Sequence, residues 1–560
     1  MLDDNNISTV KNNVKECNEI FYHLKSTLGP YGRDKLILDK NNNYLSTNDG
    51  ATILKYLKIK HPAARLLIGV AKSQDETVGD GTTSVVLLTC LLLQNSLKYI
   101  LLSIHPIIFI KGFQISLDFC LKVIDEIKVS PIQNISDLGN EKVFDNQEYL
   151  NHLNSIASTS ISSKILARFS SHFSNLGVEA IKKLRFNPVQ DLVRVIGITG
   201  NSMLESKLID GVLLEINNEQ LIHYRNEQQN NGDQFSNQFQ LVLNKPKIII
   251  GKLQLNDISS TLQNLSISAD ASIIQELETR EILTKFDLIF KLGINIVISD
   301  TLLPPLVEQL FKDKGILYFN IQDSRELETL SYCLNSKLIY DISQIEESKC
   351  TSPSKPIEIQ SIGDKIFLQV SGVSINSNGA TMVLRSPTDS MLQECIRSFK
   401  DMLNILSSSV RNPYLVGGGG SIYVEFAKRL REKATQIIKD EKILIAINCF
   451  ADSLEMIPMI LIENAGYEPI ELIGKLKSQH SQSGKENQWF GIDLNDGEIV
   501  DMFKSNVREP SFLISNILTL SSRAAQMILR INNNILIEPR SQYQIINNSP
   551  QDNSYKEEEF

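Results

Sequence analysis

Apolar residues recur at helical spacing in two blocks of the chain, one near each end. Between about residues 10 and 145 these segments are 63–73, 85–93 and 106–123, and between about 400 and 540 they are 426–438, 443–456 and 510–531. Apolar positions three and four residues apart form one face of a helix, so both blocks are predicted to be largely helical. Pro458 follows the segment 443–456, and we expect it to end that helix because proline lacks a backbone N–H donor.

The middle of the chain has a different pattern. Short β-branched runs occur at 247–251 and 294–298, and helix-like sequence such as 271–285 separates them. This alternation predicts an α/β layer with a parallel sheet. The helical sequence at both ends could then form one domain, with the α/β segment inserted into it.

Two stretches have few residues that could form a core. The segment 224–240 is rich in Asn and Gln, and we interpret it as exposed and mobile, with no role assigned to this composition. Residues 547–560 are polar and charged and are predicted to be a disordered tail.

Length, charge and cysteine usage narrow the class of protein. A chain of 560 residues is too long for one compact core, so two or more domains are expected. The formal charge of −9 argues against nucleic acid or an anionic membrane as the main partner. The seven cysteines include no C-x-x-C pair, which is typical of buried thiols in a reducing compartment. The first residues have no secretory pattern, and the most apolar stretch, 85–93, is expected to be too short to cross a bilayer. A cytoplasmic protein is predicted.

Four glycine-bearing turns are the candidate chemical sites: TLGPYGRDK (27–35), STNDGATIL (46–54), VGDGTTS (78–84) and VGGGG (416–420). In the third turn, glycines flank Asp80, and Thr82 opens an apolar helix whose free N–H groups favour an anion. A carboxylate beside bound phosphates suits Mg²⁺. Taken singly, each turn has a simpler interpretation as a capped helix, a tight turn or a linker. The chain has no G-x-x-x-x-G-K-[ST] sequence, so an ordinary P-loop is excluded.

The ordered series TLGPYGRDK, TNDGATIL, VGDGTTS, SISSK and VGGGG resembles the signature of group II chaperonins, the T-complex chaperonin family. The similarity extends from about residue 10 to 540 and is weak in the middle of the chain. The stretches HPAARLLIGVAKSQDETVGDGTTS and WFGIDLNDGEIVDMF are most similar to the eta-type subunits of the eukaryotic cytosolic chaperonin.

The resemblance implies a multidomain chaperonin fold. It has a mainly α-helical equatorial domain, a small intermediate hinge domain, and an α/β apical domain with a lid protrusion. The expected segments are equatorial 1–145, intermediate 146–211, apical 212–368, intermediate 369–400, equatorial 401–546 and a tail at 547–560.

The resemblance also implies an ATP and Mg²⁺ site. Asp80 would bind the metal, and Asp401, supported by Asp49, would act on the attacking water. The expected nucleotide-binding residues are Leu28, Gly29, Pro30, Gly50, Gly79, Gly81, Thr82, Thr83, Ser84, Ser162, Ser163, Lys164, Gly417, Gly418, Gly491 and Glu509. Among these, Lys164 would sense the γ-phosphate and Glu509 would contact the ribose.

The chain departs from the family pattern at Thr77, Ile514 and Ser386-Pro387, and Ile396 precedes Arg397 where the family has Glu. These positions bear on nucleotide affinity and hinge coupling rather than on the chemistry.

By resemblance, the chain would be one subunit of a double eight-membered ring with seven paralogous subunits. The ring would fold non-native proteins, including actin and tubulin, in a closed chamber. One alternative is a structural ring subunit that binds nucleotide but hydrolyses it weakly. A second is an unrelated small-molecule kinase with a glycine-rich site.

Overall fold

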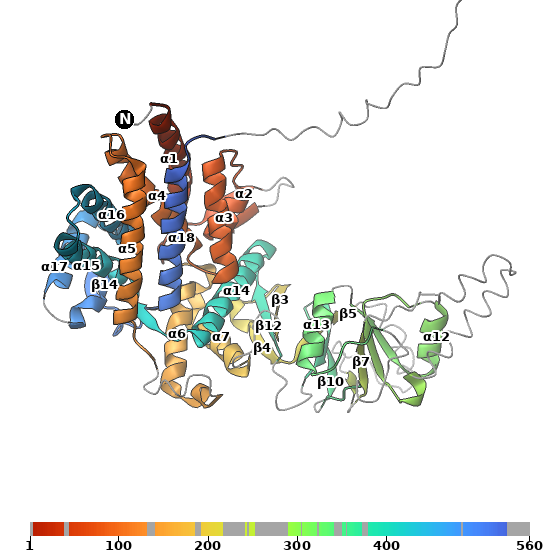
Figure 1. The fold of residues 1–560 in the computed structure, drawn as a ribbon. Coiled ribbons are helices and arrows are strands. Elements are labelled where there is room, and N and C mark those ends of the chain that lie inside the picture. Colours follow the sequence, from red (N-terminus) through yellow and green to blue (C-terminus); the bar gives the residue numbers. More distant parts are fainter. Residues whose placement is uncertain are drawn as a thin grey trace, which may run out of the picture.

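Helices from both ends of the chain pack against each other (Figure 1). The computed structural model describes residues 4–38, 44–131, 141–184, 192–216, 241–243, 246–251, 289–303, 305–321, 324–340, 350–353, 356–363, 365–371, 379–482 and 485–534. The helices that pack together, here called the terminal block, are α1 (Asp4–Lys25), α2 (Gly50–Tyr56), α3 (Pro62–Thr77), α4 (Thr82–Ile100), α5 (Pro106–Ile127), α15 (Ser421–Ile437), α16 (Glu441–Asn464), α17 (Pro469–Ser481) and α18 (Ser511–Arg530). The predicted union of the two helical ends is therefore confirmed.

The apolar character of α4 follows from its central position. Residues 85–93 of this helix are all buried, and its neighbours include α1, α16 and α18. By length and composition alone, α4, α16 and α18 could each cross a bilayer, but 67%, 61% and 56% of their apolar windows are buried inside the protein. We expected the apolar stretch at 85–93 to be too short to cross a bilayer. This was wrong for the helix that contains it, because α4 is 19 residues long. Packing within the terminal block accounts for its hydrophobicity.

Pro458 does not end a helix. It lies inside α16, which continues to Asn464, so the prediction from the sequence was wrong. Pro458 is buried, and Ile457 and Ile460 beside it are 2% and 3% exposed. Burial of this turn in the terminal block outweighs the helical hydrogen bond that proline cannot donate.

Three short antiparallel pairs edge the terminal block. They are β1 (Lys35–Leu38) with β2 (Tyr44–Thr47), β13 (Leu415–Gly417) with β16 (Arg508–Pro510), and β14 (Phe490–Asp493) with β15 (Glu498–Asp501). The second pair brings the glycine run at 417–420 beside Glu509.

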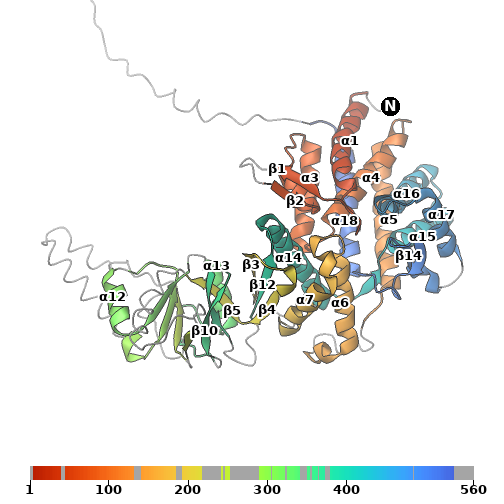
Figure 2. The same ribbon diagram turned by 180° about the vertical axis from the view of Figure 1, so that it is seen from behind.

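A middle layer lies next to the terminal block (Figures 1 and 2). Its helices are α6 (Gln147–Ile161), α7 (Ser170–Leu184) and α14 (Asp389–Arg411), and its sheet has the order β3 (Val193–Thr199), β12 (Ala380–Ser386) and β4 (Lys207–Asp210). Strands β3 and β12 are parallel, so two segments far apart in sequence meet in this layer. The predicted boundary between residues 400 and 401 falls inside α14, and Asp401 is therefore carried by the same helix as Arg397.

The remaining strands form a distal part beyond the middle layer (Figure 1). One sheet is antiparallel, in the order β5 (Val212–Ile216), β11 (Lys365–Val370), β10 (Ile357–Ile362) and β6 (Leu241–Leu243). The other is parallel, in the order β7 (Ile248–Gly251), β8 (Ile296–Ser299) and β9 (Leu317–Asn320), and it accompanies α12 (Pro305–Asp313) and α13 (Ser324–Cys333). The predicted parallel pairing of the runs at 247–251 and 294–298 is confirmed. The stretches 224–240, 271–285 and 547–560 lie outside the described residues.

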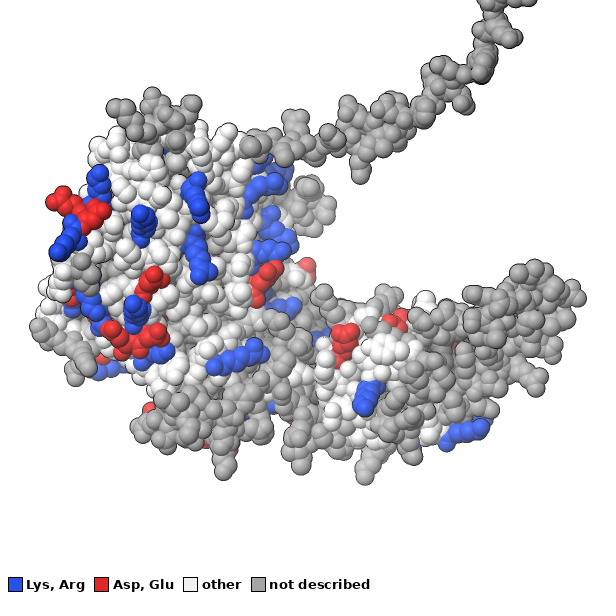
Figure 3. Space-filling model, viewed as in Figure 1, with Lys and Arg blue, Asp and Glu red and all other residues white. Residues whose placement is uncertain are grey.

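On the face shown in Figure 3, lysine and arginine side chains lie among acidic side chains over the terminal block. This face therefore carries charges of both signs.

Candidate functional site

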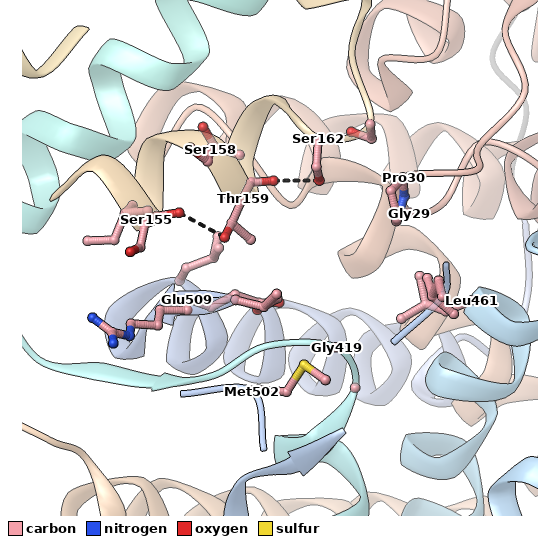
Figure 4. Close-up of a pocket in the computed structure, with 18 of the residues that line it drawn as sticks. Gly29, Pro30, Ser155, Ser158, Thr159, Ser162, Gly419, Leu461, Met502 and Glu509 are labelled. Carbon is pink, nitrogen blue, oxygen red and sulfur yellow. Dashed lines mark hydrogen bonds between the residues drawn. The ribbon is translucent and has the colours of Figure 1, made fainter. Parts of the chain in front are cut away.

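A cavity of about 910 Å³ lies between the terminal block and α6. This volume is within the range of small-molecule sites, about 300–1,000 Å³. One wall is the polar face of α6, and the opposite wall comes from the glycine turns and β16 (Figure 4). Residues expected from the sequence that line it are Leu28, Gly29, Pro30, Asp80, Gly81, Ser84, Ser162, Ser163 and Glu509.

The N-terminus of α4 opens at this cavity. Its N-cap residue, Gly81, has a left-handed backbone (φ 76°) and provides no side-chain cap for the first N–H groups of the helix. A Cβ at Gly81 would lie 3.0 Å from side-chain atoms of Leu513 and Ile517, so the close packing also favours glycine. The uncapped end of a 19-residue helix can bind an anion through its free N–H groups and its dipole.

Asp80 is held at the same turn. Its Oδ1 accepts a hydrogen bond of 2.7 Å from the backbone N–H of Gly81, and the Gln74 side-chain amide donates to its carbonyl oxygen at 2.7 Å. Burial raises the pKa of the Asp80 carboxyl, although nearby Lys164 opposes this shift. A carboxylate with this desolvation is favoured when a cation lies beside it.

Behind the cavity wall, Lys164 forms an ion pair with Asp401, and the Nζ–Oδ2 distance is 2.6 Å. The two side chains are only 8% and 13% exposed, so they are not solvated surface charges. Burial raises the pKa of Asp401 to about 7, although Lys164 opposes this shift. Burial alone would lower the pKa of Lys164, but the neighbouring carboxylates of Asp401, Asp80 and Asp49 outweigh it and raise the pKa.

Asp49 has a second, structural role as the N-cap of α2. Its carboxylate accepts hydrogen bonds from the backbone N–H of Ala51 (3.3 Å) and from the N–H and hydroxyl of Thr52 (2.9 and 2.6 Å). The hydroxyl of Thr82, at the start of α4, donates to it at 3.4 Å. The N-D-G turn is thus a helix cap that also joins the acidic cluster around Lys164.

The charges in this cluster fit a divalent cation. Asp49, Asp80 and Asp401 interact electrostatically with one lysine, Lys164, so carboxylates outnumber ammonium groups. Within the part of the chain that the structure describes, no three His, Cys, Asp or Glu residues are placed to bind a metal by themselves. Mg²⁺ typically uses one or two carboxylates together with phosphate oxygens and water.

The glycines of the run at 417–420 that line the cavity are not the two that were expected. Gly419 and Gly420 line it, whereas Gly417 and Gly418 lie in or beside β13. A Cβ at Gly418 would lie 3.1 Å from Glu509 Oε1, and a Cβ at Gly491 would lie 3.0 Å from the Gly419 carbonyl oxygen. These glycines therefore permit close packing of the wall. Burial, followed by the charge of Asp80, raises the pKa of Glu509 to about 7.

The other expected site residues surround the cavity without lining it. They are Asp49, Gly50, Gly79, Thr82, Thr83, Lys164, Asp401, Gly417, Gly418 and Gly491. A Cβ at Gly50 would lie 2.6 Å from Thr83 Oγ1, so the second and third turns pack directly against each other. The Asn48 side-chain amide donates to the Ser163 carbonyl oxygen, which links the second turn to the SISSK segment.

Sequence reasoning missed the polar stripe of α6 and much of the opposite wall. The stripe comprises Asn151, Asn154, Ser155, Ser158 and Thr159, and the wall residues include Tyr423, Leu461 and Met502. Thr159 Oγ1 donates to the Ser155 carbonyl oxygen at 2.9 Å, and Ser162 Oγ donates to the Thr159 carbonyl oxygen at 2.7 Å (Figure 4). The signal available in the sequence was the helical spacing of these polar residues, which share one face of α6.

The residues that depart from the family pattern are not among those that line the cavity. Thr77 donates to the Ser73 carbonyl oxygen and accepts from the Asn516 side-chain amide. Ile514 is fully buried in the core of the terminal block, and Ser386 is buried at the end of β12.

Comparisons with known proteins identify the family of the chain. The sequence profile described as the TCP-1/cpn60 chaperonin family matches residues 21–538. T-complex protein 1 subunit beta of Saccharomyces cerevisiae is 32% identical over 92% of this chain and 93% of its own length. Thermosome subunit alpha of Aeropyrum pernix is 31% identical over 91% of this chain and 88% of its own length. T-complex protein 1 subunit eta of Gallus gallus is 29% identical over 96% of this chain and 92% of its own length.

The eta subunit is thus among the relatives, while beta and thermosome subunits have similar identities. The family predicted from the glycine turns is confirmed by a match that includes nearly the whole chain. The chain belongs to the TCP-1/cpn60 chaperonin family, among the group II chaperonins.

Proposed function

We propose that the chain is an ATP-dependent chaperone subunit that binds Mg-ATP at the cavity and hydrolyses it to drive conformational change. One observation carries the proposal: the buried ion pair between Lys164 and Asp401 lies in the same charge cluster as Asp80, beside the uncapped end of α4. Buried charges of this kind are costly and are concentrated at functional sites.

In this proposal the N–H groups at residues 82–84 bind phosphate oxygens, and Asp80 binds the metal. Mg²⁺, when bound with ATP, neutralises phosphate charge. Leu28, Gly29 and Pro30 form one side of the nucleotide pocket, with Gly419 and Glu509 on the side of the sugar and base.

Asp401 is proposed as the general base. A pKa of about 7 leaves much of this carboxyl ionised at neutral pH while keeping it basic enough to accept a proton from water. Lys164 holds its carboxylate at 2.6 Å, and Asp49 is fixed nearby by its hydrogen bonds as the cap of α2.

The test is Asp401→Ala in the full-length protein, compared with Asp125→Ala, an exposed carboxylate on α5. General-base catalysis typically contributes about 10²–10⁴-fold, so hydrolysis should fall by at least about 100-fold while Mg-ATP affinity changes little. Phosphate release measures the first quantity and calorimetric titration the second. Unchanged hydrolysis in Asp401→Ala would remove this residue from the site.

The alternative of a structural ring subunit predicts a different pattern in the unaltered protein. It would bind Mg-ATP but release phosphate no faster than Asp401→Ala does. The retained Asp49, Asp80 and Asp401 argue against this alternative.

At the level of assembly, we propose a closed double ring of related subunits around a chamber for non-native proteins, located in the cytoplasm. The named relatives are subunits of larger proteins, which supports assembly with other subunits. The resemblance supplies three further hypotheses. The chain would have seven paralogous partners in each eight-membered ring. It would have equatorial, intermediate and apical domains, and its substrates would include actin and tubulin.

A further inference from the structure

A second buried polar group lies on α14, one to two turns before Asp401. Arg397 Nη1 forms an ion pair with the Glu394 carboxylate and donates a hydrogen bond of 3.1 Å to Thr47 Oγ1. Thr47 is the last residue of β2, directly before the turn that carries Asp49. These three residues, Thr47, Glu394 and Arg397, are called the clamp below.

The Thr47 hydroxyl connects β2 to α14 through two hydrogen bonds. It accepts from Arg397 Nη1 and from the backbone N–H of Asp49, each at 3.1 Å. These bonds occupy both acceptor positions of the hydroxyl. They hold the end of β2 against α14.

The clamp is also largely shielded from water. The Glu394 side chain is 7% exposed and that of Arg397 is 27% exposed, while Thr47 is 1% exposed. If Arg397 lost its charge, a carboxylate would remain buried without its cation, which is strongly unfavourable. The expected response is movement of Glu394 and release of the Thr47 hydroxyl.

The clamp is connected to both carboxylates that are proposed to act on the attacking water, Asp49 and Asp401. On one side, the hydroxyl of Thr47 binds the backbone of Asp49. On the other, Arg397 and Asp401 are four residues apart on α14 and therefore share a face of this helix. The clamp thereby joins the turn carrying Asp49 to the helix carrying Asp401.

We propose that Arg397 is a positioning residue for ATP hydrolysis: through Thr47 and Glu394 it sets the separation of Asp49 and Asp401 without touching the nucleotide. This inference rests on the function proposed above. A displacement of about 1 Å in such a site can lower the rate by about 100-fold, whereas the phosphate-binding turns would remain in place.

The test uses Arg397→Gln and Thr47→Val in the full-length protein. We expect both to lower turnover at saturating Mg-ATP by about tenfold or more, with the dissociation constant changed less than about twofold. Thr47→Ser keeps the hydroxyl and should retain near-normal turnover. Arg397→Lys should be intermediate, because an ammonium cannot reproduce the planar fork of guanidinium donors. Arg411→Gln, exposed at the end of the same helix, is the matched control.

Three results are decisive. Normal turnover in Arg397→Gln, together with an inactive Asp401→Ala, would overturn the positioning role and leave the proposed function intact. A parallel loss of turnover, Mg-ATP affinity and thermal stability in both Thr47→Val and Thr47→Ser would reduce the clamp to a structural contact. Normal turnover in Asp401→Ala would instead contradict the proposed function itself.

Discussion

At the scale of single residues, the site is defined by charges that are buried together. Lys164 lies 2.6 Å from Asp401 and also interacts with Asp80 and Asp49. Carboxylates away from water require cations or hydrogen-bond donors. Asp49 accepts hydrogen bonds from Ala51, Thr52 and Thr82. The charges of Asp80 and Asp401 are balanced mainly by the single lysine. In the proposed function, the metal ion would supply the additional positive charge beside these carboxylates.

Asp80→Asn should weaken Mg-ATP binding by at least about tenfold, equivalent to about 1.4 kcal/mol, because it removes the proposed metal ligand. Calorimetric titration with ATP in the presence of EDTA should show a much smaller effect, since no metal is then bound. Asp118→Asn, an exposed carboxylate on α5, serves as the control. An equal loss of affinity with and without Mg²⁺ would contradict the metal role.

Glu509 should make the folded state less stable as the pH rises from about 4.5 to 7. Its pKa is about 7 in the folded protein, against 4.5 for an ordinary glutamate, so between these two values the folded chain retains a proton that the unfolded chain has lost. Glu509→Gln cannot ionise, and at pH 8 it should be more stable than the unaltered protein by about 2 kcal/mol.

Urea unfolding at pH 5 and pH 8 measures this difference in stability, which should fall below about 1 kcal/mol at pH 5. Glu498→Gln, at an exposed position on β15, should show no such difference. An advantage of Glu509→Gln of the same size at both pH values would exclude ionisation as its cause.

The sequence identified most of these charged residues but not their environment. Lys164 and Asp401 could be named only through resemblance, because each is an ordinary charged residue in its local sequence. Their pairing joins residues 237 positions apart, and no local pattern encodes such a contact. For the same reason the clamp of Thr47, Glu394 and Arg397 could not be predicted.

At the scale of elements, the site depends on how α4 begins. Gly81 adopts a left-handed conformation with φ 76° and leaves the first N–H groups without a side-chain cap. A serine or aspartate cap would occupy one of those donors. The local sequence G-D-G-T predicted this geometry well, because glycine conformation and helix dipoles are local properties.

Gly81→Ala should destabilise the protein by about 1–2 kcal/mol, since an alanine pays a steric cost in the left-handed region and its Cβ would lie 3.0 Å from Leu513 and Ile517. Gly69→Ala is the matched control within α3, where a Cβ meets no atom within 4 Å. It should stabilise the helix by about 0.5–1 kcal/mol. Denaturant unfolding of both variants measures the contrast, and equal effects would refute this account of Gly81.

Helix ends were predicted less well where tertiary packing decides them. The helix was predicted to end at Pro458 because proline lacks an N–H donor. In the structure α16 continues to Asn464, and the residues around Pro458 are buried. The length of α4 was likewise underestimated from the apolar stretch at 85–93. The helix continues through the polar residues Gln94 and Asn95 to Ile100.

At the scale of the whole molecule, the chain leaves the terminal block, passes through the middle layer to the distal sheets, and returns (Figure 1). The outward and returning segments meet as parallel strands β3 and β12. Composition indicated such an insertion, whereas its path through the middle layer required the structure. In the middle layer α6 lines the cavity and α14 carries Asp401, so movement of this layer would alter the proposed site directly.

The most direct test of the central claim is negative-stain electron microscopy of the tagged protein purified from its own cells, with mass spectrometry of the proteins that accompany it. We predict a double ring that contains related chaperonin subunits, because a chamber for non-native proteins requires a closed ring. A monomer without such partners would contradict the proposal of a folding machine and would leave nucleotide binding as the remaining function.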